Sequence, residues 1–193
     1  MKRKKKKLTI LLVLSCILLV LVLLFFFGSR KEKIKHLTRV TTPGPSPGQV
    51  KEVPMKKITL FFLSESDGLL HPEEREIPSS TLNQEVKAVV EELVRGSRKG
   101  LFSTIPENSR VRQAFVTSDG TAYVDLSRNI MEASYFGSSG EMALVYSIVN
   151  SLAFNFKNIK RVSLLIEGNE RETLGGHIDL SRPFVPDFTL VAR

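Results

Sequence analysis

Short apolar runs from residue 57 onward predict a set of β-strands. Each run is rich in β-branched and aromatic residues and is followed by polar turn residues or a proline. The Asp119-Gly120 pair separates two of these runs and favours a hairpin. The predicted strands are a buried strand at 57–63, a short exposed edge strand at 73–77, the hairpin strands 111–116 and 121–126, and a last strand at 160–166.

Two further segments carry apolar residues at the spacing of a helix. Residues 82–94 have one apolar face and, on the opposite side, charged residues at i, i+4 spacing. Ser80 is the predicted N-cap, and Gly96 supplies a stop. The second helix runs from Glu141 to about residue 156, and Ser138 with Glu141 matches the S-x-x-E capping box.

The second helix has no charge on its outer face. One stripe is predicted to face the core, namely Met142, Val145, Tyr146, Val149, Leu152, Ala153 and Phe156. The other face carries serine and asparagine together with Leu144 and Phe154. Such a face is either overlaid by another segment or contacts a partner. We favour overlay by the C-terminal tail; in the partner alternative, Leu144 and Phe154 are the candidate contacts.

The chain order of strand, helix, hairpin, helix and strand predicts the fold class. We expect a two-layer α+β domain over residues 57–193, with a mixed sheet and two helices packed on it. About 137 residues are enough for one hydrophobic core.

The N-terminal 27 residues predict a membrane anchor. Residues 1–7 form a basic tail, and residues 8–27 are 20 uncharged, almost entirely apolar residues, enough to span a bilayer as one helix. The heavier basic flank is expected in the cytoplasm, which places the C-terminal domain outside the cell membrane. Residues 28–56, with alternating Pro and Gly, are the expected tether.

Two alternatives to the anchor stay open at this point. A cleaved secretory signal normally has a shorter apolar stretch and a small-residue cleavage site. A bacterial lipoprotein would be lipidated at Cys16, but cleavage there would leave residues 17–27 as an apolar N-terminus.

Charge and cysteine content narrow the possible partners. The formal charge of the chain is +8, but residues 1–40 contribute +10 and residues 41–193 contribute −2. The expected external domain therefore lacks the positive field that nucleic-acid binding needs. Cys16 is the only cysteine, so this domain has no disulfide, no thiolate metal site and no cysteine nucleophile.

Four segments of the domain carry a family resemblance, namely residues 58–62, residues 122–127, residues 137–141 leading into 149–152, and residues 162–168 followed by 173–179. In this order they resemble the GerMN family of bacterial sporulation and spore germination. The resemblance covers residues 57–184 and implies a fold similar to the ring-building modules of secretion machines. It implies no catalytic activity, and it implies tethering outside the membrane. This chain differs in its helix anchor and in carrying one copy of a module that some members carry in tandem.

The residues that could carry chemistry have structural explanations. His177 could be a general base oriented by Asp179 or half of a metal site, but no second ligand has metal-binding spacing. Glu141 fits a capping box better than a catalytic carboxylate. We therefore expect no catalytic, cofactor or metal site.

The leading hypothesis is a non-enzymatic envelope protein, linked to sporulation or germination, that associates with itself or with other envelope proteins. The runner-up is a binding module for a cell-wall polymer or a small ligand. A hydrolase that uses His177 is the third alternative.

Overall fold

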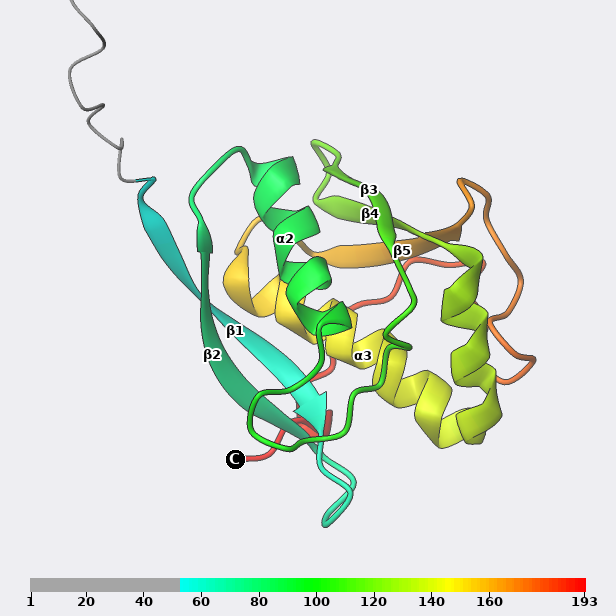
Figure 1. Ribbon diagram of the computed structural model, residues 1–193. Coiled ribbons are helices and arrows are strands. Elements are labelled where there is room, and N and C mark those ends of the chain that lie inside the picture. The colour runs from blue at the N-terminus through cyan, green and yellow to red at the C-terminus, as the bar shows by residue number, and fades with distance from the viewer. Residues whose placement is uncertain (1–52) are drawn as a thin grey trace, which may run out of the picture. The chain divides into compact units, whose positions relative to one another are not determined.

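The computed structural model describes residues 53–193, and of residues 133–136 only the backbone (Figure 1). Residues 51–193 form one compact unit. The predicted basic tail and membrane segment, and nearly all of the tether, lie outside the described residues. Within residues 53–193, no helix is long and apolar enough to cross a membrane. In chain order the elements are β1 (Met55–Leu63), β2 (Leu70–Pro78), α2 (Leu82–Val94), β3 (Val111–Val116), β4 (Thr121–Leu126), the 3₁₀ helix η1 (Arg128–Phe136), α3 (Gly137–Asn155), β5 (Arg161–Ile166) and the 3₁₀ helix η2 (Phe188–Leu190).

The strands form two sheets, and the predicted α+β class is confirmed. β1 and β2 are an antiparallel hairpin, whereas β3, β4 and β5 form a mixed sheet in which β4 and β5 run parallel. Helix α3 makes the crossover between these parallel strands, as a parallel connection requires. The predicted bounds of α2, β3 and β4 are confirmed, and Gly96 after α2 has the left-handed φ of +75°.

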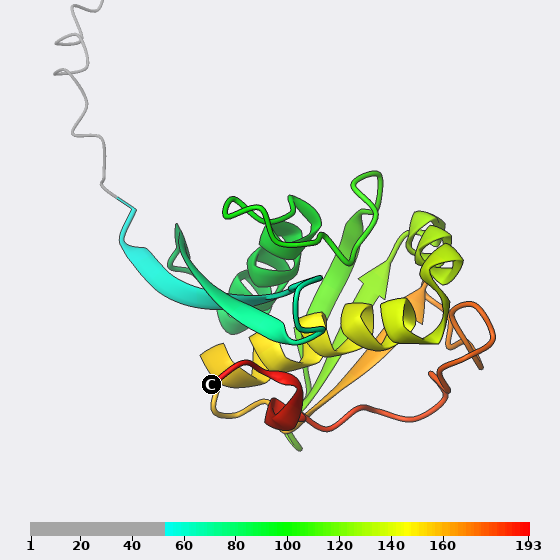
Figure 2. The same cartoon turned by 90° about the horizontal axis from the view of Figure 1, so that it is seen from below.

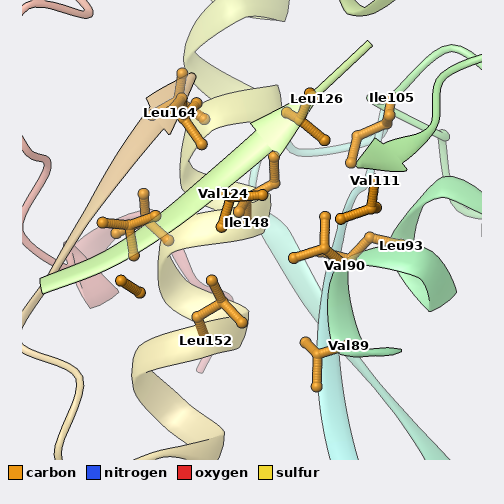
Figure 3. Packing of buried hydrophobic residues seen from close by; sticks show 14 of the residues in the cluster. Val89, Val90, Leu93, Ile105, Val111, Val124, Leu126, Ile148, Leu152 and Leu164 are labelled. Carbon is orange, nitrogen blue, oxygen red and sulfur yellow. The ribbon is translucent and has the colours of Figure 1, made fainter. Parts of the chain in front are cut away.

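The core lies between the mixed sheet and the two α-helices. Figure 3 shows Ile148 and Leu152 of α3 beside Val124 of β4, with Val90 of α2 completing the contact. All four side chains are at most 2% exposed. Alternate residues of β4 point into this core. Tyr123, which directly precedes Val124, therefore lies on the opposite face of the sheet.

The uncharged outer face of α3 covers the free edge of β1. Ser147 Oγ donates to the Phe61 carbonyl (2.6 Å), and the Phe61 N–H donates to Ser151 Oγ (3.0 Å). The Thr59 N–H donates to Asn155 Oδ1 (2.9 Å), and Asn155 Nδ2 returns a bond to the Thr59 carbonyl (2.6 Å). A buried strand edge needs partners for its backbone groups. Side chains at i, i+4 and i+8 of a helix take the place of a neighbouring strand here.

The C-terminal tail lies across the remaining outer face of α3 (Figure 2). Asn150 holds it in the middle, because its side chain donates to the Asp187 carbonyl (2.8 Å) and accepts from the Asp187 N–H (3.0 Å). Backbone bridges hold both ends, at the pairs Phe184–Val162 and Leu70–Val191. The predicted overlay by the tail is therefore confirmed, and β1 covers a further part of the helix.

Strand β2 differs from the predicted short, exposed edge strand. It spans nine residues, and its charged residues Glu73 and Arg75 are 2% and 5% exposed. Arg75 donates to Glu73 Oε1 (2.6 Å), to Glu92 Oε2 (2.9 Å) and to the Gly96 carbonyl. Burial opposes ionisation of Glu73, but hydrogen bonds from Ser97 and Arg75 outweigh it and hold the pKa of Glu73 below its ordinary value. Glu73 and Arg75 thus point inward because each finds a charged partner.

Candidate functional site

Three phenylalanines gather where the tail crosses the hairpin and α3. Phe61 of β1 is buried, and its ring centroid lies 5.5 Å from that of Phe154 and 6.4 Å from that of Phe188. Phe154 and Phe188 are themselves 6.4 Å apart, and all three pairs meet edge to face. We call Phe61, Phe154 and Phe188 the aromatic cluster. Phe154 remains 55% exposed and Phe188 47% exposed, so two large rings face solvent on a rigid base.

The tail positions Phe188 through a short capped turn. Asp187 accepts from the Thr189 N–H (2.9 Å) and from its hydroxyl (2.5 Å). These bonds, the hydroxyl first, lower the pKa of Asp187. Together with the Asn150 contact, they fix the backbone on the N-terminal side of Phe188. The ring is therefore presented on an ordered segment and loses little freedom when it binds.

Polar and apolar neighbours border the aromatic cluster. The hairpin register places Pro72 opposite Phe61 and Glu74 opposite Thr59, on the same face of the hairpin. Glu74 is exposed, and Val185 in the tail is 63% exposed. An apolar centre with a polar rim is the usual composition of a protein contact surface.

The structure separates the two predicted partner contacts. Leu144 is completely buried in the core, so its assignment as a surface contact is wrong. The reason is that α3 is enclosed between the hairpin and the mixed sheet, and an apolar residue outside its main stripe still meets protein. Phe154 is exposed, and its role as a partner contact stays a proposal.

Glu141 does not act in a capping box. Helix α3 already begins at Gly137, so Ser138 and Glu141 both lie inside it. The completely buried carboxylate of Glu141 lies 2.8 Å from His177 Nδ1 and accepts from the Ile178 N–H (3.2 Å). It therefore anchors the loop that follows β5. The predicted N-cap Ser80 is also wrong, because Thr81 precedes the first residue of α2 and makes no capping bond.

The alternative in which Asp179 orients His177 as a general base does not fit the structure. Asp179 accepts from the Ser181 N–H (2.8 Å) and hydroxyl (2.5 Å), a local turn, while Glu141 orients the imidazole. His177 Nε2 faces outward on a ring whose side chain is 45% exposed. A base oriented by a carboxylate needs a nucleophile or substrate group within reach. Among the described side chains, no serine, threonine or cysteine hydrogen-bonds to this ring.

The remaining carboxylates are occupied by structural contacts. Arg112 lies between Asp125 (3.5 Å) and Glu167 (2.9 Å), so these two acids do not form a catalytic pair. Asp125 also accepts from the Gly168 N–H (2.8 Å). Over residues 53–193, where side chains are described, no three potential ligands gather in a group that could hold a metal ion.

Sequence reasoning missed Phe188 and the Glu141–His177 contact. Phe188 lies in a tail without periodicity, and no pattern indicates that it reaches Phe61, which is 127 residues away in the chain. Glu141 offered a misleading local signal, because the capping-box spacing recurs by chance inside a helix.

Comparisons with known proteins agree with this fold. A family model described as sporulation and spore germination, named Germane, matches residues 59–172. The tandem GerMN domains of the sporulation protein GerM from Bacillus subtilis are similar at 19% identity, with a TM-score of 0.56; the match covers 76% of this chain and 50% of that one. The first GerMN domain of the same protein matches at 21% identity and a TM-score of 0.50, over 68% of this chain and 96% of that one. No curated protein matches. Because the family model covers more than half of the sequence, the chain belongs to the Germane family of sporulation and spore germination domains.

Proposed function

We propose that this protein is a non-catalytic assembly protein of the bacterial cell envelope, anchored by residues 8–27 with its folded domain outside the membrane. Family membership supports a link to sporulation or germination. A membrane tether raises the local concentration of the domain, so that weak contacts suffice for association. The partner is a second copy of the chain or another envelope protein.

The observation that carries the proposal is the exposure of Phe154 and Phe188 on a buried Phe61. Aromatic residues, phenylalanine included, are enriched in the cores of protein–protein interfaces. The two rings come from different elements, α3 and the tail, and they meet only in the folded domain.

Crosslinking of the tagged full-length chain in cells, followed by mass spectrometry, tests this proposal. Phe154→Glu should reduce crosslinks to specific envelope proteins or to a second copy several-fold. Phe115→Glu is the matched control, since Phe115 is 40% exposed on the mixed sheet, away from the aromatic cluster. Equal crosslinking in wild type and Phe154→Glu, with the folded domain intact, would contradict the proposal.

One observation favours the runner-up, a binding module for a wall polymer. Phe115 and Tyr123 stack with ring centroids 4.9 Å apart and an interplanar angle of 10°, on the face of the mixed sheet that points away from the core. Sugar rings bind to exposed aromatic faces. A titration of wall fragments that binds wild type but not Phe115→Glu would support this function, and a flat titration would exclude it.

A further inference from the structure

A cavity of about 400 Å³, open to solvent at its rim, is lined by residues other than those of the aromatic cluster. Its walls come from the turn of the β1–β2 hairpin, the first turns of α3 and the C-terminal tail. Leu63 and Leu70 close the hairpin side, Met142 and Tyr146 form the helix side, and Leu190 covers it from the tail. Cavities of this size and lining are the usual sites for small ligands.

The walls of the cavity are held in place by contacts outside it. Tyr146 meets Phe184 edge to face at 6.2 Å, which fixes its ring against the helix. The bridge between Leu70 and Val191, with the bond from the Ala192 N–H to the Leu70 carbonyl (3.0 Å), holds the tail next to Leu190. The cavity is thus formed before any ligand arrives, and ordering it costs little.

The chemistry of the lining disfavours a charged group inside the cavity. Among the residues whose side chains are described, no Asp, Glu, Lys, Arg or His lines it, so a charge buried there would lose its hydration without a partner. The polar groups available are the hydroxyls of Ser138, Ser139 and Tyr146, which make no hydrogen bond within the described part of the chain. Ser138 and Ser139 are exposed, which places their hydroxyls at the rim.

The volume limits the length of the ligand. Liquid water takes about 30 Å³ per molecule, so 400 Å³ holds on the order of a dozen groups of methylene size. Met142 lets the cavity accept ligands of slightly different shape, because a methionine side chain adapts to irregular apolar surfaces and this one is 39% exposed.

We propose that this cavity binds the end of one neutral, linear acyl or alkyl chain of about ten to twelve carbons. The apolar chain lies against Met142, Tyr146 and Leu190, and the polar end group meets the hydroxyls of Ser138 and Ser139. The site is separate from the aromatic cluster, since Phe61, Phe154 and Phe188 are not among the residues that line it.

Photolabelling of the full-length chain tests the site directly. The probe is dodecanol with a diazirine at the end of its chain, added to the protein in phosphatidylcholine vesicles. Mass spectrometry should map the label to Met142, Tyr146 or Leu190, and unlabelled dodecanol should compete. Labelling of the apolar segment 8–27 is the internal control, because it shows that the probe reached the protein in every variant.

Two cavity variants and one matched control complete the experiment. Ser139→Trp closes the rim from an exposed position, and Ala143→Leu fills the floor from a buried one. Both should reduce labelling of the cavity residues by about tenfold or more, because losing two buried methylenes already weakens binding by that much. Ser118→Trp, in the exposed turn between β3 and β4, should leave labelling unchanged.

Label spread evenly over exposed peptides, or cavity labelling that survives both variants, would overturn the proposal. A second result would also overturn it: no cavity labelling in the wild-type protein, together with loss of protein crosslinks in Ser139→Trp. That result would mean that a partner's side chain occupies the cavity. The envelope-assembly proposal is tested separately by Phe154→Glu, so either proposal can fail alone.

Discussion

The hydrogen bonds between the backbone of β1 and the side chains of α3 can be tested by removing a single atom. Ser151→Ala deletes the Oγ that accepts from the Phe61 N–H at 3.0 Å. Phe61 is 2% exposed and Ser151 is completely buried, so water cannot replace the lost acceptor. A buried donor left without a partner costs about 1–3 kcal/mol, and we take about 2 kcal/mol for this site.

A second effect of the substitution acts in the opposite direction. Alanine is a better helix former than serine by about 0.5 kcal/mol, which leaves a net loss of about 1.5 kcal/mol. For a domain of this size, that loss lowers Tm by about 3–6 °C. Ser139→Ala is the matched control, because Ser139 lies in the same helix, is exposed and makes no hydrogen bond.

Urea unfolding of residues 51–193 measures both variants. We expect Ser151→Ala to lower the midpoint with an unchanged m-value, and Ser139→Ala to stay within about 0.5 kcal/mol of wild type. If Ser151→Ala matched Ser139→Ala, the Phe61 N–H would have another partner, and the account of a helix that closes a strand edge would be refuted.

Three further predictions concern the core, the buried ion network and its pH dependence. Leu144→Glu should unfold the domain, as measured by circular dichroism, because it places an unpaired charge in the core. Phe154→Glu, at an exposed position, should lower the free energy of unfolding by only about 1 kcal/mol. A folded Leu144→Glu domain would contradict the burial of Leu144. Arg75→Met should cost about 3–5 kcal/mol in urea unfolding, since Glu73 and Glu92 lose their buried partner, and a loss below about 1 kcal/mol would show that water reaches these acids. The pKa of Glu73 lies below its ordinary 4.5 in the folded state, so its contribution is present above pH 4.5 and is lost as the pH falls through the folded pKa. Glu73→Gln should therefore flatten the loss of unfolding free energy below pH 4.5, and parallel curves for the two proteins would exclude this carboxylate as the cause.

Local patterns were reliable wherever one face of an element meets the core and the other meets water. Helix α2 and strand β3 satisfy this condition, and their predicted bounds are those of the structure. Strand β2 does not, because its inward residues include Glu73 and Arg75. Charged residues usually signal an exposed face, and only their mutual pairing at 2.6 Å allows burial.

Helix α3 shows a second limit of pattern reading. The absence of charge on its outer face was a sound signal that something covers the helix, and both β1 and the tail do so. The same pattern could not distinguish a covered residue from an exposed one. Leu144 is buried and Phe154 is exposed, although the sequence placed both on the same face.

The sequence by itself determined the α+β class, the order of the main elements, the family and the lack of net positive charge in the expected external domain. These follow from periodicity, composition and short motifs, which depend on neighbours within one or two turns of chain. The tertiary structure alone decided that Ser151 closes a strand edge, that Glu141 binds the loop at His177, and that Phe188 joins Phe61. Each of these contacts joins residues 36 to 127 positions apart, and its stability comes from burial that no local pattern encodes.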